Sequence, residues 1–154
     1  MTKRHYILSV IACAALVLAP GCTTTDSYGN PVPDTAKNAK IAAGLKLIVA
    51  ETVAPIVRNN VRVAPYLHQV AAVFCRMKTD GRFSPIQLRD TLNLIPIPPD
   101  ISPAVTSIKN ALLGIYEATY NGNIDIVLDP QKFGGMIAEA ACDGIATGLI
   151  DSGH

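Results

Sequence analysis

The chain has 154 residues, 49 % of them hydrophobic, and a formal net charge of +1. Without residues 1–21, which read as a leader, it has 11 basic and 12 acidic residues, so it lacks the strongly basic charge of a nucleic-acid-binding protein. A chain of this size can bury one hydrophobic core, and one domain is expected.

The first 21 residues have the composition of an export signal. Lys3 and Arg4 form a positive cluster, residues 7–19 are almost wholly apolar, and Gly21 precedes Cys22. A charged start, a short apolar run and small residues before a cleavage point are typical of a secretory signal peptide. The run is too short to cross a bilayer, which takes about 20 apolar residues.

Residues 18–22 (LAPGC) resemble the lipobox of bacterial lipoproteins. The resemblance covers residues 1–22 only. It implies cleavage before Cys22, a diacylglycerol on its sulfur and an acyl chain on its amino group. The segment departs from the usual pattern, because Ala19 stands three residues before the cysteine, where leucine is normal. Ordinary signal cleavage at the same bond, with Cys22 left as a thiol, is the alternative.

Acyl chains would replace a membrane helix, since each buried methylene contributes about 0.8 kcal/mol and two chains give stable attachment. Thr23 follows the cysteine where inner-membrane lipoproteins of the enteric type often carry aspartate. The resemblance therefore implies an outer-membrane lipoprotein that faces the periplasm. Residues 22–35 are polar and contain Gly29, Pro31 and Pro33, which favours a flexible tether after the lipidated cysteine.

Hydrophobic periodicity predicts a helical domain over residues 36–150, with residues 151–154 as a tail. The first helix begins at Thr35 or Ala36 and should end or kink at Pro55, because proline removes an amide donor. Residues 53–58 (VAPIVR) are echoed by residues 63–68 (VAPYLH), which suggests two helix starts, each with a proline in its first turn. Later helices are expected over about 65–78, from Ser84-Pro85 through Leu92, from Ser102-Pro103 to about Tyr120, and from Asp129-Pro130 to about Ile150.

These elements predict an all-α fold, a compact bundle of about five helices with proline-punctuated turns. A tiny two-stranded β link between Phe83 and Ile124 is a further hypothesis. Residues 80–84 and 121–125 each echo the second half of an EF-hand loop, but neither has the carboxylates that calcium needs.

The last predicted helix is rich in small residues. We expect them to admit a neighbouring helix of the same domain rather than to mediate dimerisation in a membrane, because Glu139 and Asp143 lie among them. These residues are Gly134, Gly135, Ala138, Ala140, Ala141, Gly144 and Gly148.

Three cysteines follow the leader. If Cys22 is acylated, Cys75 and Cys142 are an even pair in an oxidising compartment, and a structural disulfide would join the second helix to the last. Two separately buried thiols are the alternative, since cysteine packs like a small hydrophobe. His68 lies seven residues before Cys75, but a lone helical histidine is usually a packed or surface residue, and we expect no metal.

Charge is distributed unevenly along the chain. Residues 36–89 carry nine basic and two acidic residues, and residues 90–154 carry two basic and eight acidic ones. Two halves that pack with opposite charges side by side would explain this. The alternative is a basic face turned toward envelope polyanions or anionic lipid. Arg58 and Arg62, one helical turn apart, are the candidate contact face.

The sequence contains no Gly-x-Ser-x-Gly, His-Glu-x-x-His or phosphate-binding loop, and we expect no catalytic residues. It predicts a non-catalytic binding or structural module in the cell envelope. The membrane is contacted through the lipid anchor, and the partner is an envelope protein, the cell wall or a lipid, not nucleic acid. We expect no cofactor besides the lipid on Cys22. A periplasmic carrier of a small apolar ligand is the alternative.

Overall fold

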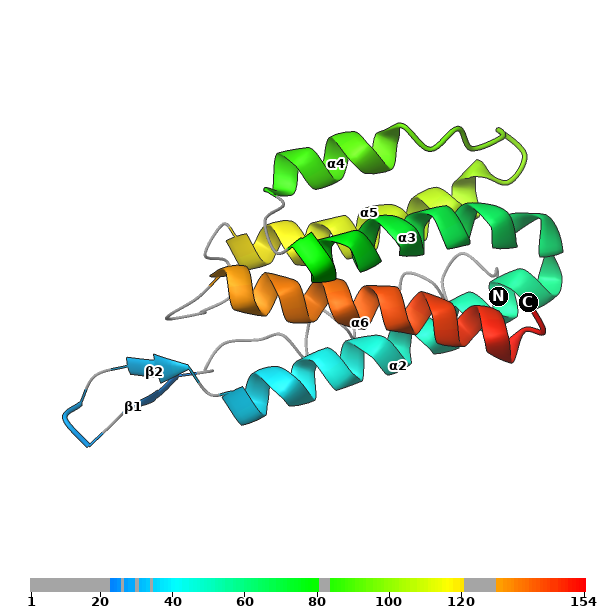
Figure 1. Ribbon diagram of the computed structural model, residues 1–154. Helices are drawn as coiled ribbons and strands as arrows, with labels where there is room; N and C mark the ends of the chain where they lie inside the picture. Colours follow the sequence, from blue (N-terminus) through cyan, green and yellow to red (C-terminus); the bar gives the residue numbers. More distant parts are fainter. Residues whose placement is uncertain (1–22, 26, 30, 34, 81–83, 121–129) are drawn as a thin grey trace.

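The computed structural model describes residues 23–25, 27–29, 31–33, 35–80, 84–120 and 130–154. Five α-helices lie within these residues: α2 (Thr35–Asn59), α3 (Ala64–Asp80), α4 (Pro85–Asn93), α5 (Ser102–Tyr120) and α6 (Pro130–Asp151). A short 3-10 helix, η1 (Val61–Val63), joins α2 to α3. The prediction of an all-α bundle is confirmed (Figure 1). The predicted signal peptide, Cys22, Phe83 and Ile124 lie outside the described residues.

Helix α6 lies at the centre of the bundle. It packs against α2 on one side and against α3 and α5 on the other, and α4 lies on the side of the bundle away from α2 (Figure 1). Among the described residues, Phe133–Asp151 is long and apolar enough to cross a membrane, and 61 % of that window is buried inside the bundle. A helix with neighbours on both sides needs this composition, so burial in the protein core accounts for it.

Glycines on α6 allow α2 to approach closely. A Cβ added at Gly144 would lie 2.8 Å from the backbone oxygen of Lys46, and one at Gly148 would lie 2.8 Å from the backbone oxygen of Ala50. The contacts advance by four residues on both helices, so α2 and α6 run parallel to each other (Figure 1). The expectation that these small residues admit a neighbouring helix of the same domain is confirmed.

Helix α2 continues through Pro55 to Asn59, so the prediction of a new helix start at this proline is wrong. Val53 and Val57, on either side of Pro55, are fully buried, while Pro55 itself is exposed. Burial of such side chains stabilises by about 1.5–3 kcal/mol each, which offsets the cost of about 3 kcal/mol for an interior proline. Residues 63–68, the second of the two similar segments, do contain a helix start as predicted, because Pro65 lies in the first turn of α3.

The predicted start of α4 is confirmed in detail. Ser84 caps the helix by accepting a hydrogen bond from the Gln87 amide at 3.3 Å, and Gln87 Oε1 accepts one from the Ser84 amide at 3.0 Å. Pro85 occupies the first helical turn, where its missing amide donor is not needed. The residues that cap this helix are neighbours in the sequence, so the boundary could be predicted locally.

Two short strands precede α2, in the segment that the sequence predicts as a tether. Strand β1 (Thr23–Thr25) pairs with β2 (Pro31–Pro33) in antiparallel register, with Thr23 opposite Pro33. The pair projects beyond the N-terminal end of α2, away from the helices (Figure 1).

Candidate functional site

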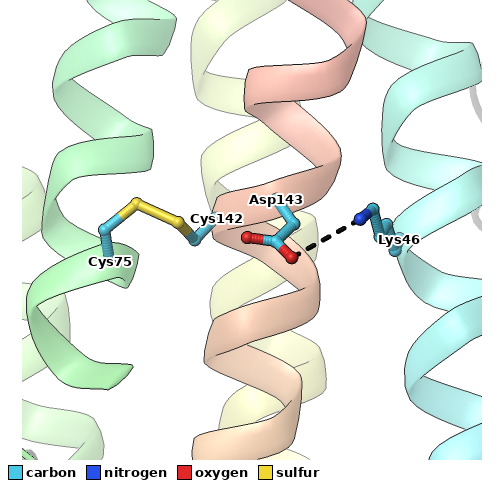
Figure 2. The surroundings of a disulfide bond; sticks show 4 residues. All are labelled: Lys46, Cys75, Cys142 and Asp143. Atoms are coloured by element: carbon cyan, nitrogen blue, oxygen red, sulfur yellow. Dashed lines mark hydrogen bonds and ion pairs between the residues drawn. A yellow bond between two sulfur atoms is a disulfide. The ribbon is translucent and has the colours of Figure 1, made fainter. Parts of the chain in front are cut away.

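Cys75 on α3 and Cys142 on α6 are joined by a disulfide, with an S–S distance of 2.03 Å and a Cα–Cα distance of 5.1 Å (Figure 2). Cys142 is buried and Cys75 is half-buried. These are the two cysteines that remain as a possible pair when the cysteines after the leader are counted. Because both sulfurs are bonded to each other, they cannot serve as metal ligands together with His68, whose side chain is exposed.

The residue after Cys142 attaches α6 to the opposite neighbour. Asp143 Oδ2 lies 3.4 Å from Lys46 Nζ on α2, with the two side chains 36 % and 47 % exposed (Figure 2). An exposed pair of this kind contributes about 0–1 kcal/mol. Consecutive residues of α6 therefore connect to α3 through a covalent bond and to α2 through a weak ion pair.

Two further ion pairs join the basic half of the chain to the acidic half. Arg62 Nη1 lies 2.6 Å from Asp100 Oδ2, and Arg89 pairs with Glu117. With Lys46–Asp143, these contacts confirm that opposite charges of the two halves lie side by side. The basic face turned toward polyanions stays a prediction.

The candidate contact residues Arg58 and Arg62 do not share a helix, contrary to the spacing argument. Helix α2 ends at Asn59, and Arg62 belongs to η1. Asn60 separates them because its backbone is extended, at φ −153°, and its side chain accepts a hydrogen bond from the Arg62 amide at 3.2 Å. Both arginines also contact other parts of the protein, Arg62 through its ion pair with Asp100.

Arg58 holds the C-terminal end of α6. Its Nη2 donates a hydrogen bond of 2.7 Å to the carbonyl oxygen of Asp151. The same end closes with hydrogen bonds from the His154 amide to the Leu149 oxygen and from the Gly153 amide to the Ile150 oxygen. Gly153 has φ +88°, the left-handed conformation that this C-cap requires. Sequence reasoning missed the role of Arg58, because the contact joins residues 93 positions apart.

Two surface depressions lie near this end of the bundle. One, of about 370 Å³, is lined by residues of α2 and by Asp151, with Glu51 and Arg58 among them. The other, of about 260 Å³, is lined largely by apolar side chains that include Ile56 and Ile101. The described residues contain no group of three or more His, Cys, Asp or Glu side chains that could hold a metal ion.

At the opposite end, Tyr116 and Tyr120 of α5 pack together over α6. Their ring centroids are 4.9 Å apart, and the Tyr116 hydroxyl donates a hydrogen bond to the Tyr120 hydroxyl at 3.0 Å. A Cβ at Gly134 would lie 2.8 Å from the Tyr120 ring. Burial, then the hydrogen bond, raises the pKa of Tyr116 far above its usual value, so this hydroxyl stays protonated near neutral pH.

Comparisons of the chain with protein-family models, with curated proteins and with solved structures find no match.

Proposed function

We propose that the protein is a lipid-anchored, non-catalytic binding or structural module of the bacterial cell envelope, attached to the outer membrane and facing the periplasm. The distribution of the four cysteines carries this proposal. Cys13 belongs to the apolar leader, and Cys75 and Cys142 are joined to each other. Cys22, at the cleavage junction, is then the one thiol left in the mature chain. A disulfide is typical of exported proteins, and a lone cysteine at a mature N-terminus suits lipid attachment.

The bundle suits a module that presents a fixed surface. The core helix α6 is attached to α3 by the disulfide and packs closely on α2 through Gly144 and Gly148. A lipid anchor confines such a surface to a thin layer next to the membrane. The effective concentration of a partner in that layer is high, so a small contact suffices for binding.

Cell fractionation tests the anchor. In a bacterium with an outer membrane, we expect the wild-type protein in the membrane fraction after washing with high salt, and in solution only after detergent is added. A Cys22→Ser variant should be absent from the washed membrane fraction, because serine cannot accept the diacylglycerol thioether. Wild-type protein recovered in the soluble periplasmic fraction would contradict the proposal.

The end of the bundle around Arg62 is the proposed contact surface for an envelope partner such as the cell wall. The Arg62 side chain is 66 % exposed although it pairs with Asp100. Sedimentation with purified cell-wall sacculi compares two variants that lose the same ion pair. Arg62→Ala should reduce co-sedimentation, whereas Asp100→Ala should not, because it keeps the cation. Equal co-sedimentation of the two variants with sacculi would exclude Arg62 as a contact.

A carrier of a small apolar ligand is the second candidate function. The depression lined by Ile56 and Ile101 favours it, although its volume of about 260 Å³ is below the range of about 300–1,000 Å³ that is usual for ligand pockets. Organic extraction of protein purified from its native source, followed by mass spectrometry, tests this function. A stoichiometric ligand would support a carrier, and its absence would favour the binding or structural module.

A further inference from the structure

The β1–β2 pair shortens the connection between the proposed anchor and the helices. Thr23 lies opposite Pro33, and Pro33 is two residues before Thr35, where α2 begins. Residues opposite each other in an antiparallel pair have Cα atoms about 4.5–5.5 Å apart. The Cα of Thr23, the residue after Cys22, therefore lies within about 13 Å of the start of α2, whereas twelve extended residues would reach about 40 Å.

The first half of α2 is basic: it carries Lys37, Lys40 and Lys46, and no acidic residue occurs on the helix before Glu51. Lys40 and Lys46 are exposed, whereas Lys37 is half-buried. The core-facing side is formed by buried Ile41, Leu45 and Val49. The opposite side follows helical spacing and is exposed, and its members are Ala36, Lys40, Ala43 and Leu47.

Leu47 is the large apolar side chain on this outer side, and 62 % of it is exposed. Lys46 adjoins it and stays 47 % exposed although it pairs with Asp143. Lysines beside an exposed leucine are typical of helices that lie in the interface of a membrane, where the apolar side chain enters the headgroup region and the cations meet lipid phosphates.

We propose that this outer face of α2, defined by Ala36, Lys40, Ala43 and Leu47 and bordered by Lys46, lies on the anionic phospholipid surface of the membrane that holds Cys22. The inference rests on the proposed lipid anchor and adds a face and an orientation to it. Each lysine near an anionic surface contributes about a fivefold gain in membrane affinity, which is weak for a free domain. The anchor makes the contact intramolecular, so that a weak affinity is enough.

This orientation places the bundle along the membrane. Helix α4, which carries the exposed Ile86, lies on the side of the bundle away from α2 and therefore away from the lipid (Figure 1). The end that carries Arg62 is displaced along the membrane by the length of α2, about 37 Å for its 25 residues. It remains accessible to a partner in the periplasm.

Tryptophan fluorescence tests the orientation, because the chain contains no tryptophan. Leu47→Trp places the reporter on the proposed face, and Ile86→Trp, at a residue that is 69 % exposed on α4, is the matched control. The thiol of Cys22 in the mature protein is coupled to a maleimide phospholipid, which supplies the anchor chemically. The vesicles contain phosphatidylcholine and phosphatidylglycerol with brominated acyl chains, which quench tryptophan only at the membrane.

We expect quenching and a blue shift for the Leu47→Trp protein and neither for the Ile86→Trp protein. Adding Lys40→Glu to Leu47→Trp should lower the ratio of membrane-bound to free orientations about fivefold or more, and circular dichroism checks that the variant is folded. Replacing phosphatidylglycerol by phosphatidylcholine should have the same effect.

Equal quenching at the two positions, or none at position 47, would overturn the orientation. Quenching at position 47 that is changed neither by Lys40→Glu nor by the removal of phosphatidylglycerol would overturn the role of the lysines. Because the anchor is synthetic, these results do not depend on whether cells lipidate Cys22. Failure of the proposed anchor would be seen only in cell fractionation, so the two failures are distinguishable.

Discussion

Gly148 of α6 lies against the backbone of α2 at Ala50, where a Cβ on the glycine would be 2.8 Å from the Ala50 oxygen. The neighbouring atom is backbone, so it cannot move aside as a flexible side chain would. Close approach of two parallel helices at this point therefore requires glycine.

Gly148→Ala should lower the free energy of unfolding by about 1–3 kcal/mol, because overpacking outweighs the higher helix propensity of alanine. Gly135→Ala is the control on the same helix, since a Cβ there meets nothing within 4 Å. It should raise the free energy of unfolding by up to about 1 kcal/mol. Urea denaturation measures both variants. Similar effects at the two positions would contradict the close contact between α2 and α6.

The disulfide closes a loop between residues 67 positions apart, so its removal should lower stability strongly. Replacing Cys75 and Cys142 together by alanine should lower the free energy of unfolding by about 4 kcal/mol on the loop-entropy argument. Urea denaturation with and without reductant measures the change. Reductant should destabilise the wild type and leave the double variant unaffected. A wild type that is insensitive to reductant would show that the bond does not form.

Removing the Arg58 side chain should loosen the C-terminal end of α6. Arg58→Ala deletes the hydrogen bond to the Asp151 oxygen and a cation near a helix C-terminus, which together stabilise by about 1–2 kcal/mol. Hydrogen exchange should accelerate at the amides of residues 152–154. Arg62→Ala is the control, because it loses only an exposed ion pair and should not change exchange there. Unchanged exchange in Arg58→Ala would exclude the capping role.

Burial of Tyr116 should make the protein sensitive to alkaline pH. Desolvation and the hydrogen bond to Tyr120 raise the pKa of Tyr116 in the folded state above 10.0, the value for an exposed tyrosine. The folded state then keeps a proton that the unfolded state releases, so this contribution to stability is complete below about pH 10 and is lost as pH rises further.

Tyr116→Phe should therefore lose less stability than the wild type between pH 9 and pH 11, even though it is less stable near neutral pH by about 1 kcal/mol. Urea denaturation across this pH interval measures the difference. Tyr66→Phe provides a control at a half-buried tyrosine. Parallel pH profiles for the wild type and Tyr116→Phe would contradict the raised pKa.

Features determined by neighbouring residues could be predicted from the sequence. The Ser84-Pro85 start of α4 depends on a capping box within four residues. Counting cysteines after the leader indicates Cys75 and Cys142 as a possible pair but leaves two separately buried thiols open, and the packing of α3 on α6 decides between them. Features that depend on distant contacts could not. Pro55 stays inside α2 because buried valines on both sides hold the helix against α6. The hydrogen bond from Arg58 to the end of α6 joins two segments that are far apart in the sequence, so no local pattern predicts it. The pairing of Thr23 with Pro33 is likewise not predicted from the residues between them.

The central claim is that Cys22 carries the anchor while Cys75 and Cys142 are bonded to each other. The intact mass of the protein from its native membrane fraction, measured with and without reductant, tests it directly. We expect the mass of residues 22–154 plus a diacylglycerol and an acyl chain, and a gain of about 2 Da when reduction adds two hydrogen atoms to the disulfide. A mass that matches the unmodified chain cut before Cys22 would contradict the account, because the protein would then be a freely diffusing exported domain.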